Sequence, residues 1–327
     1  MSAFDCIFGN AETVSALKKS IASGKTASSY IISGPEMSGK YTLTKEFACA
    51  LTEKTPADNA ALMCRKIRDG ISPDITVCSP ADKKSIGIED IRDIFRTVYT
   101  TPNELDFRMF IIRGAHTLTV QAQNALLKVF EEPPPDSYIF LLCESRAKLL
   151  PTLISRAQNL DTETFDRETL DGYFKGKYDV GRDRAELAYL LSGGALGKAE
   201  KLLSDDEITD VYRSVCDIIA SFKNDDVYAS LDAVLKACST REACGETLKM
   251  LSLAAGDMIN ASFGADKRTR FFMTEKEAKN AAEISDAEKI ALLLNRLSEL
   301  QANLDYNANA VSTAFAAYIA LKQCFYR

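Results

Sequence analysis

The sequence predicts an α/β domain built on a parallel sheet, followed by helices to the end of the chain. Short apolar runs alternate with amphipathic helical runs over the first half, and this alternation is typical of right-handed βαβ units. A glycine-rich loop directly follows the first apolar run. Beyond Ser204 the apolar residues follow helical spacing. We therefore expect an α/β domain over residues 1–165, a small helical subdomain over 166–205 and a helical domain over 206–327.

The strands expected in the first half are short apolar runs. Two of them, RMFIIRGA and YIFLLCES, are apolar almost throughout, as are strands of a parallel sheet covered on both faces. Thr119 is a suitable N-cap for the helix between them, and Pro133–Pro135 end that helix. We expect strands at 29–34, 72–80, 108–115 and 138–145, a strand-like run after Arg156, and helices at 40–51, 88–99 and 120–131.

Length and charge exclude several classes of protein. The chain has 327 residues, with 40 Lys and Arg residues against 46 Asp and Glu residues, which gives a net charge of −6. Its 46% apolar and 26% charged residues are ordinary for a globular protein and exclude a disordered chain. A free-standing nucleic-acid-binding protein usually carries a basic excess. Contact with DNA is therefore expected only inside a larger assembly.

Cysteine and histidine usage limits the chemistry further. The nine cysteines are an odd number and form no CxxC pair, which indicates reduced thiols. His116 is the only histidine, so a histidine-rich metal site cannot form. No apolar run approaches the roughly 20 residues of a membrane span, and the N-terminus lacks the pattern of a signal peptide. We therefore predict a cytoplasmic protein that does not associate with a membrane.

A phosphate-binding loop is predicted between the first strand and the helix that follows it. Gly34, Gly39 and Lys40 have the GxxxxGK spacing. In such a loop, backbone N–H groups and a helix N-terminus hold the phosphates, and the lysine contacts the β- and γ-phosphates. Tyr41, however, stands where a serine or threonine hydroxyl would bind Mg²⁺. The loop is therefore predicted to be degenerate, with weak binding of ATP or ADP at most and no hydrolysis.

The third strand departs from an ATP-hydrolysing site as well. In such sites an acidic residue at this strand end holds Mg²⁺. Here the strand ends in Arg113 and Gly114, and neither side chain can ligate a cation. His116 follows at once and is interpreted as a loop histidine rather than a catalytic residue. No metal site is predicted.

Three segments of the chain resemble one family. The strings YIISGPEMSGK, RMFIIRGAHTLTVQAQNALLKVFEEPP and KLLPTLISR are similar to the AAA+ clamp-loader subunits of bacterial DNA polymerase III. The resemblance is dense from Phe4 to Phe165 and weaker in the later string LSGGALGKA. Its most specific block is Asn124–Lys128 followed by Glu131–Pro134. It implies a degenerate AAA+ module, then a small helical lid and a C-terminal oligomerisation domain of the collar type.

The resemblance also implies that the subunit does not hydrolyse ATP. The polar sensor position after the fourth strand falls at Glu144–Ser145, where a carboxylate would repel a γ-phosphate. The lid arginine of the family pattern GxxR falls on Gly197. Together with Tyr41 and Arg113, four parts of the phosphate site are weakened.

One functional feature of the family is retained, and it centres on Arg156. Ser155-Arg156-Ala157 matches the family motif Ser-Arg-Cys, with only the cysteine replaced. The resemblance implies that Arg156, with Ser155, acts in trans as an arginine finger on ATP bound to a neighbouring gamma/tau subunit. The implied partners are the gamma/tau and delta subunits, with the sliding clamp and primer-template DNA reached through the complex.

The resemblance raises the question of zinc, because many family members carry four cysteines before the second strand. Here only Cys64 matches that set, and Ala61 stands where a partner is expected. Structural zinc needs four nitrogen or sulfur ligands. Cys49 and Cys78 do not supply the family spacing, so we predict that zinc is absent.

Two other functions stay open at this stage. Gly39 and Lys40 would suit a competent AAA+ ATPase with another remodelling function, whereas Tyr41, Arg113 and Gly197 oppose it. A helical adaptor with a vestigial α/β part is the other alternative, and a functional Arg156 would oppose that one.

Overall fold

A computed structural model describes residues 2–53, 59–80, 85–96, 98–178, 182–204, 206–223, 226–264, 269–306 and 308–326. The chain divides into two compact units. The first comprises Met1–Phe165 together with Ala195–Gly197, and the second comprises Asp166–Gly194 and Lys198–Arg327.

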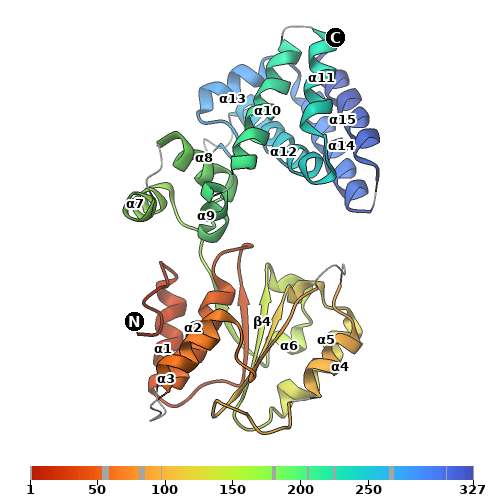
Figure 1. The fold of residues 1–327 in the computed structure, drawn as a ribbon. Coiled ribbons are helices and arrows are strands. Elements are labelled where there is room, and N and C mark those ends of the chain that lie inside the picture. Colours follow the sequence, from red (N-terminus) through yellow and green to blue (C-terminus); the bar gives the residue numbers. More distant parts are fainter. Residues whose placement is uncertain are drawn as a thin grey trace. The chain divides into compact units, whose positions relative to one another are not determined.

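The first unit is built on a five-stranded sheet in which every pair of neighbouring strands is parallel. The strand order is β2-β3-β4-β1-β5 (Figure 1). The strands are β1 (Ser29–Ser33), β2 (Ile75–Cys78), β3 (Arg108–Arg113), β4 (Ser137–Cys143) and β5 (Gln158–Asp161). The carboxyl ends of all five strands therefore lie along one edge of the sheet, and their amino ends lie along the opposite edge. We call these the carboxyl edge and the amino edge.

Helices cover both faces of this sheet (Figure 1). On one face lie α1 (Ala11–Ala22), α2 (Lys40–Thr52) and α3 (Ala60–Asp69), and on the other α4 (Ile88–Phe95), α5 (Val120–Glu131) and α6 (Pro151–Ile154). Two short 3₁₀ helices, η1 (Ala115–Thr117) and η2 (Arg146–Lys148), follow β3 and β4. The α/β sheet domain predicted from the sequence is thus confirmed.

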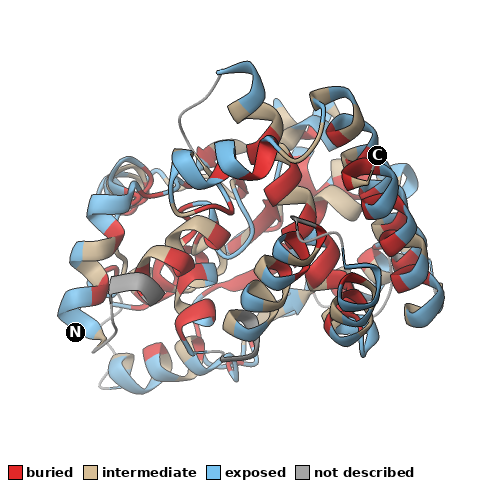
Figure 2. Cartoon of the chain, turned by 90° about the horizontal axis from the view of Figure 1, so that it is seen from above, coloured by how far each residue is buried: buried red, intermediate tan, exposed pale blue. Residues whose placement is uncertain are grey.

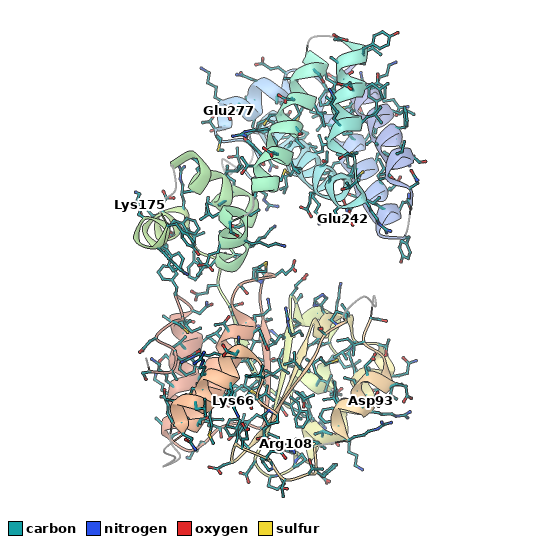
Figure 3. The ribbon with its side chains drawn as sticks, viewed as in Figure 1. Lys66, Asp93, Arg108, Lys175, Glu242 and Glu277 are labelled. Carbon is teal, nitrogen blue, oxygen red and sulfur yellow. The ribbon has the colours of Figure 1, made fainter. Side chains whose placement is uncertain are left out.

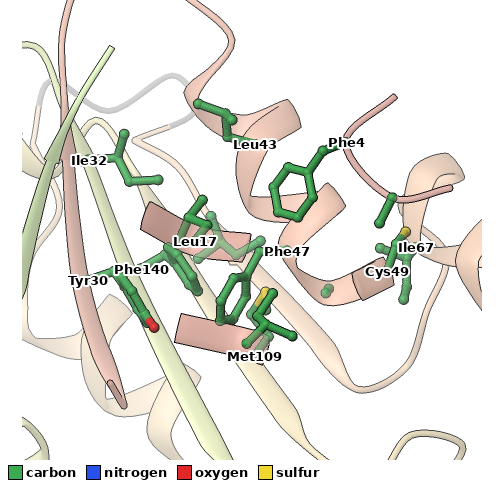
Figure 4. Close-up of a cluster of buried hydrophobic side chains, with 14 of the residues drawn as sticks. Phe4, Leu17, Tyr30, Ile32, Leu43, Phe47, Cys49, Ile67, Met109 and Phe140 are labelled. Atoms are coloured by element: carbon green, nitrogen blue, oxygen red, sulfur yellow. The ribbon is translucent and has the colours of Figure 1, made fainter. Parts of the chain in front are cut away.

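Buried aromatic rings from the sheet and α2 form the centre of the first face (Figure 4). The Tyr30 and Phe140 rings of neighbouring strands stack with centroids 4.6 Å apart, and Phe47 of α2 meets each of them at 5.3 Å. Such pairs stabilise a core by about 0.5–1.5 kcal/mol each beyond their buried area. They fix α2, and with it the loop that precedes this helix, against the sheet.

The first, third and fourth expected strands end one or two residues early, at Ser33, Arg113 and Cys143, and two other elements are shortened by four or five residues. The strand expected over 72–80 forms only over Ile75–Cys78, as β2. Before it, the buried Asp74 binds the loop at 103–105 instead of continuing the strand. Its carboxylate accepts the backbone N–H groups of Asn103, Glu104 and Leu105 at 2.7–2.9 Å. Burial opposes ionisation, but these bonds outweigh it and lower the pKa of Asp74. The helix expected over 88–99 ends at Phe95.

Polar contacts also fix the amino edge of the sheet. Arg108, labelled in Figure 3, begins β3 and donates from Nε to the Thr100 carbonyl at 2.9 Å and from Nη2 to the Thr101 carbonyl at 2.7 Å. The bonds tie the start of β3 to the loop before it.

The second unit is helical in its described residues. Buried residues recur at helical spacing along the described parts of these helices, and Figure 2 colours the chain by burial. The helices are α7 (Arg167–Lys177), α8 (Arg182–Ser192), α9 (Leu196–Ser204), α10 (Asp206–Lys223), α11 (Val227–Ala237), α12 (Arg241–Phe263), α13 (Glu275–Ala282), α14 (Ala287–Asp305) and α15 (Ala310–Phe325). Gly193 and Gly194 have positive φ values of 61° and 83° and end α8.

A buried carboxylate organises the connection after the longest helix. Asp257 of α12 accepts the backbone N–H groups of Arg270, Phe271 and Phe272 at 2.8–3.1 Å. This segment leads into α13. Among the described helices, none combines the length and the apolar character that crossing a membrane requires.

Candidate functional site

The glycine-rich loop lies at the carboxyl edge, between β1 and α2, as predicted. Gly34 has φ 147°, and a Cβ there would lie 2.1 Å from Thr162 Oγ1, so only glycine fits. Gly39 has φ 89° and is the N-cap of α2. Both glycines therefore adopt backbone angles that other residues rarely reach, as expected for a loop of the GxxxxGK type.

The lysine of this loop is engaged by the loop itself. Lys40 Nζ donates to the Gly34 carbonyl at 2.6 Å, to the Pro35 carbonyl, and to Ser38 Oγ at 3.4 Å. Burial lowers the pKa of Lys40, an effect that the nearby Glu144 carboxylate partly opposes. The ammonium thus closes the loop on its own carbonyls.

Other parts of the loop are also tied internally. The buried Ser38 hydroxyl lies 2.6 Å from Thr162 Oγ1. Gly197 donates its backbone N–H to the Met37 carbonyl at 3.0 Å, and a Cβ at position 197 would lie only 2.7 Å from that oxygen. The position that the resemblance assigns to a lid arginine therefore has no room for any side chain in this arrangement.

The two residues that replace the Mg²⁺ ligands contact each other. The Arg113 guanidinium, at the end of β3, lies 5.0 Å from the centroid of the Tyr41 ring. Lys45 Nζ lies 4.9 Å from the same ring. These are cation–π distances. A ring and two cations do not fit Mg²⁺, which requires oxygen ligands in an octahedral arrangement.

The sensor position carries a histidine–carboxylate pair. Glu144 follows β4, and its backbone N–H donates to His116 Nδ1 at 3.4 Å. His116 Nε2 lies 3.7 Å from Glu144 Oε1. The Ser145 hydroxyl accepts the N–H of Ala147 and caps η2. His116 is therefore held in the loop after β3 by contacts to the sensor segment.

A cluster that the sequence did not predict lies beside the loop. Asp161, the last residue of β5, accepts hydrogen bonds from Ser33 Oγ and from Arg146 Nη2. The three side chains come from β1, β5 and η2, so only the folded sheet brings them together. Spacing along the chain gave no signal for them.

Arg156 lies at the other side of the sheet, at the amino edge. It follows α6 and precedes β5, whose first residue, Gln158, pairs with Tyr30 at the start of β1. Asp161 pairs with Ser33, the last residue before the loop. Three strand steps of about 3.3 Å separate Gln158 from Asp161, and Arg156 lies two residues further back. Arg156 therefore cannot reach the phosphate loop of its own chain.

The Arg156 guanidinium has partners within its own unit. Nη2 lies 2.8 Å from Glu131 Oε1, at the end of α5, and Nη1 donates to the Thr152 carbonyl at 3.1 Å. The side chain remains 38% exposed. Ser155 Oγ donates to the same Thr152 carbonyl at 3.2 Å. Arg156 thus forms an ion pair with a carboxylate of its own chain at the surface, the contact that a purely structural role of this arginine would also give.

Around Cys64 the structure shows thiol packing and an ion pair. The Cys49 and Cys64 thiols each donate to the carbonyl of the other at 3.7 Å. Burial raises the pKa of both thiols. Nearby, Arg68 donates two hydrogen bonds to the buried Glu46 at 2.7 and 2.8 Å. No group of three or more potential ligands lies together within the described part of the chain, and the zinc prediction stays a prediction.

Comparison with known proteins places this site in a family. Residues 9–166 match the family model described as "DNA polymerase III, delta subunit". The chain is 32% identical to the tau subunit of DNA polymerase III from Bacillus subtilis over 174 residues, 52% of the chain and 30% of that protein. It is 34% identical to the delta' subunit from Haemophilus influenzae over 117 residues, 36% of each chain.

Further relatives extend this match. The delta' subunit from Pseudomonas aeruginosa is 29% identical over 182 residues, 54% of this chain and 56% of that one. The chain thus spans between 30% and 56% of these relatives. The solved structure of a gamma subunit-related protein of DNA polymerase III from Thermotoga maritima has a TM-score of 0.57 at 16% identity, covering 95% of this chain and 99% of that one. At that identity the likeness supports the fold alone.

The sheet, its glycine-rich loop and the helical region that follows define a P-loop protein of the AAA+ class. Over residues 9–166 the chain is similar to the clamp-loader subunits of DNA polymerase III, the delta' subunits among them.

Proposed function

We propose that the chain is a non-catalytic delta' subunit of the DNA polymerase III clamp loader in the bacterial cytoplasm. It would assemble with gamma/tau and delta subunits through its helical C-terminal domain. The complex would place the sliding clamp on primed DNA during replication. The observation that carries this proposal is the position of Arg156, half-exposed at the amino edge and out of reach of the chain's own loop.

The state of the chain's own loop supports a non-catalytic role. Lys40 is engaged by the loop carbonyls, and Tyr41 and Arg113 stack on each other instead of presenting oxygen ligands. Without a metal ligand set, the site would lack the Mg²⁺ that bridges the β- and γ-phosphates and neutralises the charge developing on the transferred group. Backbone N–H groups of the loop would still allow weak binding of ATP or ADP without hydrolysis.

Arg156 would act on ATP bound by the neighbouring gamma/tau subunit, with Ser155 beside it. A guanidinium presents a planar fork of N–H donors that matches two phosphate oxygens. Arginine fingers supplied in trans raise phosphoryl-transfer rates by about 10³–10⁵ in GTPases. A finger on this surface can meet only a phosphate that belongs to another subunit.

A competent AAA+ ATPase of another remodelling function is the rival proposal, and the intact glycines with Lys40 favour it. Turnover by the isolated chain separates the two. We expect no ATP hydrolysis above background with Mg²⁺. Sustained turnover that disappears in a Lys40→Ala variant would overturn the non-catalytic assignment.

The direct test is a reconstituted complex with gamma/tau and delta subunits. Arg156→Ala should leave assembly intact and lower DNA-stimulated ATPase and clamp loading. Arg92→Ala is a matched control, because Arg92 is also an exposed arginine in an ion pair, with Glu89 on α4. Equal activity of the two variants would contradict the finger role.

A further inference from the structure

The ion pair between Arg156 and Glu131 differs from most surface pairs of this chain. Among the described pairs of the first unit, three exposed arginine pairs, such as Arg92 with Glu89, join residues three or four apart, whereas Arg146 with Asp161 joins η2 to β5. Arg156 and Glu131 are 25 positions apart. Arg156 lies in the turn after α6, and Glu131 is the last residue of α5. The contact therefore depends on how α5 and the turn after α6 pack together, whereas a pair within one helical turn depends on that helix alone.

The backbone segment that carries the Thr152 carbonyl is itself fixed. The buried side chain of Gln123 on α5 accepts the Leu150 N–H at 2.7 Å and donates to the Lys148 carbonyl at 3.1 Å. Asn159 Nδ2 donates to the carbonyls of Ile154 and Ala157 at 2.9 and 3.0 Å. These bonds fasten the segment before α6 and the turn after it. The Thr152 carbonyl therefore has a fixed position, and Glu131 meets Arg156 from the end of α5.

The hydrogen-bonding capacity of Arg156 is only partly used by this arrangement. A guanidinium has five N–H donors. The contacts with Glu131 and Thr152 use one nitrogen each, Nη2 and Nη1. Donors therefore remain for phosphate oxygens while the carboxylate stays in place.

We propose that Glu131 is a positioning residue for Arg156. Its carboxylate, with the Thr152 carbonyl, holds the guanidinium at the amino edge in the orientation in which it meets a phosphate on the neighbouring subunit. Arginine side chains lose much rotamer freedom when they are ordered. Ordering Arg156 before ATP arrives removes part of that cost from the reaction. This inference rests on the proposed finger role of Arg156.

The test uses Glu131→Gln in the reconstituted complex, with Glu132→Gln as the control. Glu132 is the exposed neighbour of Glu131 and carries the same charge. We expect Glu131→Gln to lower kcat of the DNA-stimulated ATPase by roughly three- to tenfold at the ATP site of the neighbouring subunit that Arg156 would contact. The reason is that the rate depends on the orientation of the Arg156 guanidinium. KM for ATP should change little, since the bound nucleotide belongs to the neighbouring subunit. Glu132→Gln should match the wild-type complex.

A double-variant cycle isolates the coupling between the two side chains. In an Arg156→Ala background, Glu131→Gln should have no further effect on kcat, because the group that it positions is gone. The melting temperature of isolated Glu131→Gln should stay within about 2 °C of wild type, since exposed ion pairs stabilise little. Glu131→Asp, with the charge retained on a shorter stem, should give an intermediate kcat.

The outcomes separate the two proposals. If Arg156→Ala has no effect, the finger role fails, and the role of Glu131 fails with it. If Arg156→Ala lowers turnover while Glu131→Gln behaves like Glu132→Gln, only the positioning role is wrong. A higher kcat for Glu131→Gln would also overturn it, because the carboxylate would then restrain the finger rather than orient it.

Discussion

The carboxyl edge and the amino edge of the sheet differ in which residues of the family's phosphate site they retain. At the carboxyl edge the loop retains the glycines, but Tyr41 and Arg113 form a ring–cation contact where Mg²⁺ ligands would stand. At the amino edge Arg156 remains exposed and oriented. Under the proposed function, an ATP site of the complex would take a loop from one chain and a finger from the next. This chain would then give a finger without using its own loop.

The largest expected effect concerns the amino edge. Arg156→Ala should lower ATP turnover at the served site of the complex by about a hundredfold or more, because a charge-stabilising donor is lost. Arg156→Lys should rescue poorly, since an ammonium cannot reproduce the bidentate fork. Steady-state ATPase and clamp-loading assays on the reconstituted complex check both. Full rescue by lysine would mean that charge alone is needed there.

The next effect concerns α2, the helix that begins at the loop. Glu46 of α2 is 1% exposed, and its partner Arg68 on α3 is 32% exposed. Arg68→Met should lower the free energy of unfolding by about 2 kcal/mol, because it leaves a buried carboxylate without its cation. The midpoint of urea unfolding measures this. The reverse variant, Glu46→Met, should cost less, because the half-exposed Arg68 can turn to water.

The same pair predicts a dependence on pH. Burial alone raises the pKa of Glu46, but the Arg68 hydrogen bonds outweigh it and hold the pKa below its usual 4.5. A lowered folded-state pKa means that this stabilisation is present above pH 4.5 and is lost as the pH falls through the folded value. In Arg68→Met the Arg68 bonds are lost and the pKa of Glu46 rises, so protonation in acid should relieve the buried charge, and the stability difference from wild type should narrow as the pH falls below about 4.5. A stability difference that stayed constant with pH would contradict this.

A smaller effect is expected at the loop itself. Lys40→Ala should lower the free energy of unfolding by about 1 kcal/mol, because the loop carbonyls lose their charged donor. Turnover of the complex should fall far less than with Arg156→Ala. A comparison of the two variants in one reconstitution therefore tests the contrast between the edges directly. A larger loss for Lys40→Ala would indicate that the loop still binds a nucleotide that the complex needs.

The smallest effect is expected from metal removal. Cys49 and Cys64 pack against each other's carbonyls, and Ala61 offers no ligand. Chelators should therefore leave the melting temperature unchanged within error, and elemental analysis should find far less than one zinc per chain. Stoichiometric zinc would show that the ligand set lies elsewhere in the chain.

Local patterns predicted the regular elements well, for reasons that lie within a few residues. Thr119 accepts the Ala122 N–H and caps α5 as expected, and Gly34 and Gly39 shape the loop by their own backbone freedom. The ends of β2 and α4 were predicted less well. The extent of β2 depends on Asp74, whose partners lie about thirty residues further along the chain.

The sequence by itself determined the α/β class, the degenerate loop and the presence of an arginine after α6. These follow from residue types at fixed spacing, where periodicity and capping act locally. Only the tertiary structure decided that Tyr41 stacks on Arg113, that Met37 leaves no room at Gly197, and that Arg156 pairs with Glu131 away from its own loop. The physical reason is that sheet register, set by buried packing, brings residues that are distant in sequence to one edge or to opposite ones.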